Sequence, residues 1–145
     1  MKVETILRKK GRQVITVRPD ATLQRAAELL ARHNIGVLLV VDAGDRPVGI
    51  ISERDIVRCF AADGDGWAAT TVLSSMTADL IVGVPTDEVG YVMQVMTQQR
   101  IRHLPIVDEG ELCGLVSIGD VVKAQLNESE AEIRHLRSYI TGLPT

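Results

Sequence analysis

The feature that most constrains this chain is an internal repeat, because the second half of the sequence replays the first half in the same order. The stretch from Gly49 to Asp55, GIISERD, returns as GLVSIGD from Gly114 to Asp120. Upstream of each copy, identical residues recur at matching positions: Ile35/Ile101, Leu38/Leu104, Val41/Val107, Asp42/Asp108 and Gly44/Gly110. So many matches in one register predict that the chain contains two copies of one structural unit.

In the first half, apolar spacing predicts the order strand, helix, strand, strand, helix. Apolar runs of strand length occupy residues 14–17, 37–41 and 47–52, the last two being joined by turn residues 42–46. Between them, helical spacing of three and four recurs at Leu23, Ala26, Ala27 and Leu30. Asp20 or Thr22 could cap this helix. A second helix is predicted over residues 55–61, before the breakers at 63–66.

The second half predicts the same elements. Residues 81–84 match the first strand, and helical spacing returns at Val89, Val92, Met93 and Met96. Residues 103–108 and 112–117 repeat the hairpin. Each half is preceded by a short apolar segment, 3–7 or 72–76, and the basic residues 8–12 are interpreted as a solvated loop that could also supply positive charge to a ligand or partner.

A unit of this size cannot bury a core alone, so the two repeats are expected to pack sheet to sheet about a pseudo-twofold axis. The predicted fold class is α+β, with repeats over residues 1–66 and 67–126 and a helical tail over 127–145 that ends at Gly142 and Pro144. The tail continues the last helix, because apolar residues persist at helical spacing: Val122, Leu126, Ile133, Leu136 and Ile140. This stripe is expected to pack either on the module or on a second subunit.

Composition excludes several classes of protein. The 145 residues are 46% apolar with a net charge of −3, which argues against a nucleic-acid-binding protein. No apolar run is long enough to span a membrane. Cys59 and Cys113 lack metal-ligand spacing, so we predict no metal site and no disulfide, with Cys113 buried in a strand. The expectation is a cytoplasmic protein with reduced thiols.

The paired pattern of two repeats, each ending in glycine, two apolar residues, serine, two variable residues and aspartate, resembles a tandem cystathionine-β-synthase (CBS) domain pair, also called a Bateman module. IRHLPIVD at residues 101–108 and the helical tail resemble small stand-alone bacterial members. The resemblance implies regulatory binding of AMP, ADP, ATP, S-adenosylmethionine or NAD(H), with no cofactor required, and assembly into flat dimers.

An adenosine ligand needs a carboxylate for the ribose, an apolar slot for the base, and N–H groups or positive charge for phosphate. In the second repeat, Asp120 suits the ribose, Ser117 lies in the same turn, and Gly119 would admit a phosphate. The resemblance places Arg102 and His103 at the phosphate end. The complete candidate set for this site is Val82, Arg102, His103, Leu104, Pro105, Ile106, Ser117, Gly119 and Asp120, with Val82 and Ile106 as the base slot.

The matching site of the first repeat lacks counterparts of Arg102 and His103. Its candidates are Thr16, Gly36, Val37, Val40, Ser52, Arg54 and Asp55, with Thr16 and Val40 as the base slot. We therefore expect unequal sites, the second repeat holding the better one. A simpler role remains open for each junction: Ser52, Asp55, Ser117 and Asp120 could act only as helix caps. His103 could equally be a structural histidine.

The resulting hypothesis is a non-catalytic, homodimeric module that senses an adenosine-containing small molecule and regulates a target protein. A structural interaction module with unoccupied clefts is the alternative. An enzyme is a weaker rival, because His33, His103 and His135 have no nucleophile and acid partners at a suitable spacing.

Overall fold

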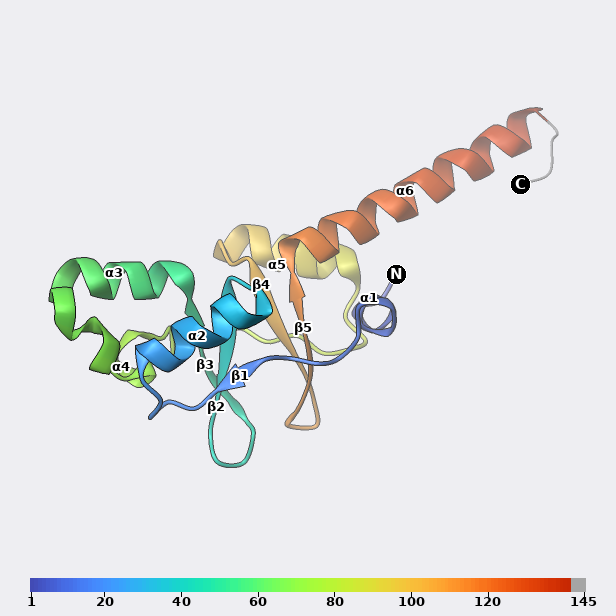
Figure 1. Cartoon of the computed structure of the whole chain (residues 1–145). Coiled ribbons are helices and arrows are strands. Elements are labelled where there is room, and N and C mark those ends of the chain that lie inside the picture. The colour runs from blue at the N-terminus through green and yellow to red at the C-terminus, as the bar shows by residue number, and fades with distance from the viewer. Residues whose placement is uncertain (142–145) are drawn as a thin grey trace. The chain divides into compact units, whose positions relative to one another are not determined.

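Both halves of the sequence fold into a similar order of helices and strands, although β1 has no complete counterpart in the second half (Figure 1). The structure is a computed structural model that describes residues 1–141. In chain order the elements are α1 (Val3–Lys10), β1 (Thr16–Val17), α2 (Leu23–His33), β2 (Val37–Val41), β3 (Pro47–Ser52), α3 (Glu53–Asp63), the 3-10 helix η1 (Gly64–Ala69), α4 (Val72–Ser75), α5 (Val89–Gln99), β4 (His103–Asp108), β5 (Glu111–Ser117) and α6 (Ile118–Thr141).

By spatial contact the chain divides into two compact units, which do not coincide with the sequence repeats. The first, called the α6 unit, joins Met1–Arg12 to Gly83–Val107 and to the chain from Cys113 onward. The second, called the β2 unit, comprises Gln13–Val82 with Asp108–Leu112. Helix α1 therefore belongs with the elements of the second repeat, and the short helix α4 belongs with those of the first.

In the β2 unit, the expected strand and helix order is confirmed. Strand β2 pairs with β1 in parallel and with β3 in antiparallel, Leu39 lying opposite both Thr16 and Ile50. Helix α2 begins after Thr22, whose hydroxyl accepts a hydrogen bond from the Arg25 N–H, so Thr22 and not Asp20 provides the cap. The buried core residues come from β1, α2, β2, β3 and α4: Val17, Leu23, Ala26, Leu30, Leu38, Val40, Ile51 and Val72.

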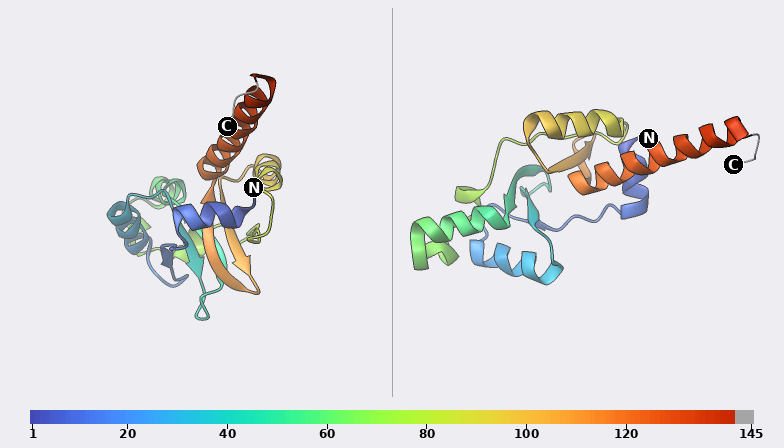
Figure 2. Two further views of the ribbon diagram at one scale, coloured as in Figure 1. Left: turned by 90° about the vertical axis from the view of Figure 1, so that its right-hand side faces the viewer. Right: turned by 90° about the horizontal axis from the view of Figure 1, so that it is seen from above.

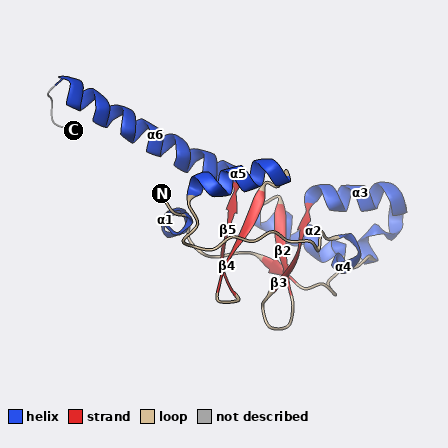
Figure 3. Ribbon diagram, turned by 180° about the vertical axis from the view of Figure 1, so that it is seen from behind, coloured by secondary structure: helices blue, strands red, loops and turns tan. Residues whose placement is uncertain are grey.

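In the α6 unit, β4 and β5 form the expected hairpin (Figure 3). The strand predicted over residues 81–84 is wrong in extent, because only Gly83 bridges to Ile106. The Asp87 carboxylate accepts the Val84 N–H at 2.9 Å, and Pro85 has no N–H to donate, so strand pairing stops there. A side chain at Gly83 would also lie 2.9 Å from Leu104 Cδ2, so this approach requires glycine.

The interpretation of residues 8–12 as a loop is also wrong, since Arg8, Lys9 and Lys10 form the last turn of α1. Val3, Ile6 and Leu7 are buried and hold the helix on its unit. Three cations in the last turn complement the negative end of the helix dipole, and Gly11 follows with a φ of 96°.

The long C-terminal helix is confirmed as one uninterrupted element of 24 residues, α6. The expected end of the tail at Gly142 and Pro144 lies outside the described residues. Cys59 and Cys113 are not joined in a disulfide, and Cys113 is half-buried rather than fully buried as expected. Among residues 1–141, no helix has the length and apolar character required to cross a membrane.

Candidate ligand-binding site

The two strand-to-helix junctions are built alike, by a reciprocal serine and aspartate pair. At the start of α6, the Ser117 N–H donates to Asp120 Oδ2 at 2.9 Å, and the Asp120 N–H donates to Ser117 Oγ at 3.1 Å. At the start of α3, the same two bonds join Ser52 and Asp55 at 2.8 and 3.2 Å. Both pairs therefore cap their helices. Because these bonds use Oδ2 of each carboxylate, Oδ1 is the atom that a ligand would meet.

The junctions differ in a lysine that the sequence did not assign to the site. Lys10, in the last turn of α1, places Nζ 2.6 Å from Asp120 Oδ2 and 2.9 Å from the Leu115 carbonyl oxygen. In the sequence, Lys10 stood out only as one of the basic residues in the segment 8–12. An ion pair now joins α1 to the candidate ribose-binding carboxylate within one unit.

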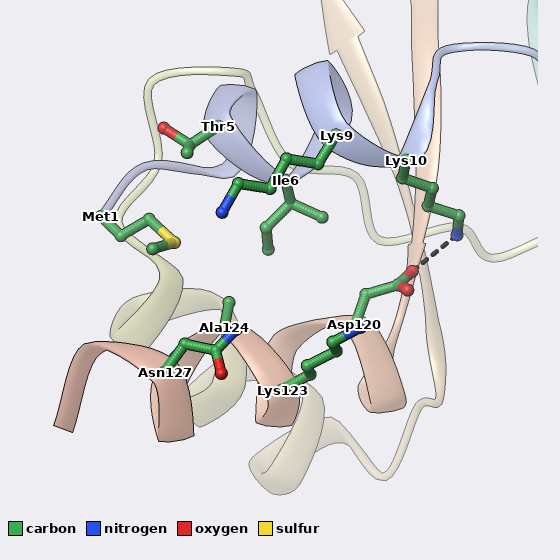
Figure 4. Close-up of a pocket in the computed structure, with 9 residues that line it drawn as sticks. All are labelled: Met1, Thr5, Ile6, Lys9, Lys10, Asp120, Lys123, Ala124 and Asn127. Carbon is green, nitrogen blue, oxygen red and sulfur yellow. Dashed lines mark hydrogen bonds and ion pairs between the residues drawn. The ribbon is translucent and has the colours of Figure 1, made fainter. Parts of the chain in front are cut away.

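A pocket of about 310 Å³ opens beside this ion pair, between α1 and α6 (Figure 4). Helix α6 contributes residues at successive turns, beginning with Asp120, and α1 contributes the opposite wall. The lining residues are Met1, Thr5, Ile6, Lys9, Lys10, Asp120, Lys123, Ala124 and Asn127. Three lysines and one carboxylate give this pocket a net positive charge, so it favours an anionic ligand.

A comparable pocket of about 350 Å³ lies in the β2 unit beside Asp55, between α3 and α4. It is lined by Asp55, Arg58, Cys59, Asp63, Thr70, Ser74 and Ser75. Asp55 is the first lining residue from α3, as Asp120 is the first lining residue from α6 in the other pocket. The lining contains one arginine and two carboxylates, so this pocket carries a net negative charge. The two pockets therefore differ most in the ligand charge that they would accept.

The environment of Asp120 keeps its carboxylate ionised. Partial burial alone would raise the pKa of Asp120. The hydrogen bonds from Lys10 and Ser117, together with the charge of Lys10, outweigh burial and hold the pKa below its ordinary value. Asp120 is therefore a carboxylate acceptor at neutral pH, as recognition of a hydroxyl pair requires.

Arg102 and His103 lie where the chain enters β4, next to the same junction. The Arg102 carbonyl oxygen accepts the Ile118 N–H at 2.8 Å, and Gly36 accepts the Glu53 N–H at 3.0 Å in the first repeat. Arg102 and Gly36 thus occupy equivalent places, but only Arg102 brings a charge. Burial lowers the pKa of His103, and the positive charges of Lys10 and Arg102 lower it further, against the opposing effect of Asp120.

The other candidates are distributed between core and surface. Leu104, Pro105, Ile106 and Val40 are buried, so their side chains serve the core before any ligand. Thr16 and Val37 are half-buried, whereas Gly36, Arg54, Gly119 and Val82 are exposed. The structure brings together Ser117, Asp120, Arg102 and His103 in the α6 unit, and it places Val82 in the β2 unit. Ligand contact by any of these residues stays a prediction.

The protonation of His103 gives a test of this electrostatic arrangement. In NMR titration His103 is expected to titrate below the ordinary value of 6.5, and Lys10→Gln should raise its pKa by removing a repelling charge. In the unfolded chain His103 has its ordinary pKa of 6.5, so the unfolded chain takes up a proton at a higher pH than the folded chain does. His103 therefore lowers the free energy of unfolding as the pH falls through 6.5 toward its folded pKa. An unshifted His103, or one that does not respond to Lys10→Gln, would contradict the proximity of the two cations.

Comparison with known proteins agrees with the repeat geometry. The CBS domain family model matches residues 3–62 and again 71–127. The mitochondrial CBS domain-containing protein CBSX3 of Arabidopsis thaliana is 35% identical over 148 residues, covering 97% of this chain and 72% of the relative.

Solved structures show the same fold. A CBS-domain containing protein from Agrobacterium tumefaciens aligns with a TM-score of 0.81 at 38% identity, covering 86% of this chain and 99% of that one. The CBS domain pair of protein MJ0100, in complex with 5′-methylthioadenosine and S-adenosyl-L-methionine, aligns with a TM-score of 0.77 at 27% identity, covering 88% and 98%. The chain therefore belongs to the CBS domain family and carries a tandem pair of these domains, a Bateman module.

Proposed function

We propose that this chain is a regulatory module, without catalytic activity, that binds an adenosine-containing ligand in the pocket between α1 and α6. The observation that carries the proposal is the ionised Asp120 carboxylate at the edge of a pocket that also contains Lys9, Lys10 and Lys123. The MJ0100 pair, which shares this fold, binds two adenosine-containing ligands. A carboxylate for ribose hydroxyls and cations for phosphate are the groups that such a ligand needs.

The ribose is proposed to bind at Asp120 Oδ1, because Oδ2 already accepts bonds from Ser117 and Lys10. Arg102 and His103 lie on the side of β4, next to the same junction. A ligand that approaches Asp120 must meet Lys10, whose ammonium can then turn from the carboxylate to a phosphate. Ligand occupancy would in this way alter the contact that joins α1 to α6.

The charge of the pocket favours a phosphate-bearing ligand, such as AMP, ADP, ATP or NAD(H), over the sulfonium cation of S-adenosylmethionine. The lysines would attract phosphate and repel a sulfonium. The pocket beside Asp55 has the opposite charge balance, since Asp55 and Asp63 outnumber Arg58. It is therefore proposed to be the weaker site for a phosphate-bearing ligand.

Regulation requires that the ligand bind one arrangement of the module better than another. We place this change at the Lys10–Asp120 ion pair, and we propose that a homodimer transmits it to a target protein. Cys59 and Cys113, which form no disulfide, are compatible with a reducing compartment such as the cytoplasm. The exposed apolar residues of α6 favour a second function, protein interaction, which does not depend on ligand.

Neutralising the pocket tests where phosphate binds. Lys9→Ala/Lys123→Ala is expected to weaken ATP binding by roughly tenfold, about 1.4 kcal/mol, and to leave adenosine binding unchanged. Lys2→Ala is the matched control, because Lys2 is exposed and outside the pocket. Calorimetric titration measures all four combinations of ligand and variant. Equal ATP affinity in the double variant and in Lys2→Ala would place the phosphate elsewhere.

A further inference from the structure

Helix α6 presents an apolar face that its own unit does not cover within residues 1–141. The exposed fractions are 40% for Val122, 58% for Leu126, 49% for Ile133, 58% for Leu136 and 80% for Ile140. Val121 and Ala124, which fall outside this face, are only 0% and 7% exposed and pack on the unit. In both views, α6 continues past α1 and α5 (Figures 1 and 2). The exposed face therefore runs from Val122 to Ile140.

The spacing of this face indicates what can cover it. Together with Ser129, its residues alternate in steps of four and three from Val122 to Ile140, as the a and d positions of a heptad repeat do. We call these six residues the α6 seam. Leu126, Ile133 and Ile140 fall at a, whereas Val122, Ser129 and Leu136 fall at d. A stripe limited to these two positions is the narrow face of a coiled coil, and a core-facing helix usually has a wider one.

We infer that the α6 seam pairs with the α6 seam of a second copy of this chain, as a parallel two-stranded coiled coil. β-Branched residues at a with leucine at d favour two parallel strands, and Ile133, Leu136 and Ile140 follow this pattern. A seam that matches itself forms a symmetric, isologous contact. Parallel pairing also sets Ser129 against Ser129, so that the polar layer is not placed against an isoleucine.

The residues that flank the seam agree with parallel pairing. In such a coil, each g position faces the e position of the next heptad in the other helix. Glu132 at g then faces Arg137 of the second copy, a pair of opposite charges. Gln125 faces Glu130, and Ile118 faces Lys123, so no like charges meet. The inference extends the proposed homodimer and does not require a ligand.

Sedimentation equilibrium on the full chain tests the contact. The wild type is expected to dimerise, and Ile133→Glu/Leu136→Glu should raise the dimer dissociation constant by at least about tenfold, because it buries four carboxylates in the pair. Ala131→Glu is the matched control: it adds a carboxylate on the same stretch of helix but outside the seam, and it should leave the constant within about twofold. A monomeric wild type, or equal constants for both variants, would overturn the inference, even if the chain captured a different protein.

Cross-linking tests the orientation. In a Cys59→Ala/Cys113→Ala background, Ser129→Cys should form an intermolecular disulfide under mild oxidation, because parallel pairing brings the two residues into one layer. Ala131→Cys, outside the seam, should not. A disulfide with Ala131→Cys, or none with Ser129→Cys, would overturn parallel pairing.

Nucleotide titration of Ile133→Glu/Leu136→Glu separates this inference from the proposed function. The seam shares no residue with the pocket between α1 and α6. The variant is therefore expected to bind ATP with wild-type affinity while it dimerises poorly. If the wild type dimerises but neither protein binds nucleotide, the proposed function is refuted and the seam stands. If both proteins bind nucleotide and the variant dimerises as well as the wild type does, the seam is refuted and the proposed function stands.

Discussion

Asp120→Ala is expected to abolish the rise in melting temperature that an adenosine ligand gives to the wild-type protein. A ligand at one hundred times its dissociation constant adds about 2.7 kcal/mol of stability, which is easily measured. The variant removes the carboxylate proposed to hold the ribose and leaves Lys10 without its ion-pair partner. Differential scanning fluorimetry with ATP, AMP, NADH and S-adenosylmethionine measures the ligand shift for each protein.

The control for this experiment comes from the internal repeat. Asp55→Ala removes an equivalent helix-capping aspartate, so each variant should lose a similar amount of intrinsic stability, about 1 kcal/mol. Only Asp120→Ala should lose the ligand shift, since the pocket beside Asp55 carries the opposite charge. If both variants keep the shift, ligand binding does not use either junction. If only Asp55→Ala loses it, the proposed order of the two sites is reversed.

Leu7→Ala is expected to lower the free energy of unfolding by about 2–5 kcal/mol. Leu7 is 1% exposed and packs against Gly114, where an added Cβ would lie 2.6 Å from Leu7 Cδ2. The truncation therefore leaves a cavity between α1 and β5 that glycine has no side chain to fill. Chemical denaturation followed by circular dichroism gives the difference between variant and wild type.

Leu73→Ala is the matched control for this truncation, because Leu73 also lies on a short helix but is 60% exposed. Its effect should stay within about 0.5 kcal/mol. Leu7→Ala should also weaken nucleotide binding, since α1 carries Lys9 and Lys10. Equal stability of the two variants would show that α1 is not packed in the core as described.

Much of the fold could be predicted because its signals are local. The period of apolar residues around Leu23 or Val89 depends only on which face of one helix is buried. Both junctions could be found because a serine and an aspartate three residues apart cap a helix within a single turn. The strand expected at 81–84 failed because the Asp87 side chain and Pro85 end its pairing after one residue.

The candidate site was predicted only in part, because some of it depends on contacts between distant segments. Lys10 reaches Asp120 because α1 packs by Leu7 on Gly114, more than half the chain away. A basic run alone does not reveal this contact, and a loop was therefore the natural interpretation. The burial of Val40 and Ile106 likewise could not be predicted from the sequence. An apolar residue in a strand can face either a ligand or the core, and the sequence pattern is the same in both cases.

The most direct test of the proposed function is a calorimetric titration of the purified chain with AMP, ADP, ATP, NADH and S-adenosylmethionine. We predict that at least one phosphate-bearing ligand binds to the wild type at one strong site per chain, and that Asp120→Ala removes this site. If none of the five ligands binds to the wild type, the chain is not an adenosine-ligand sensor.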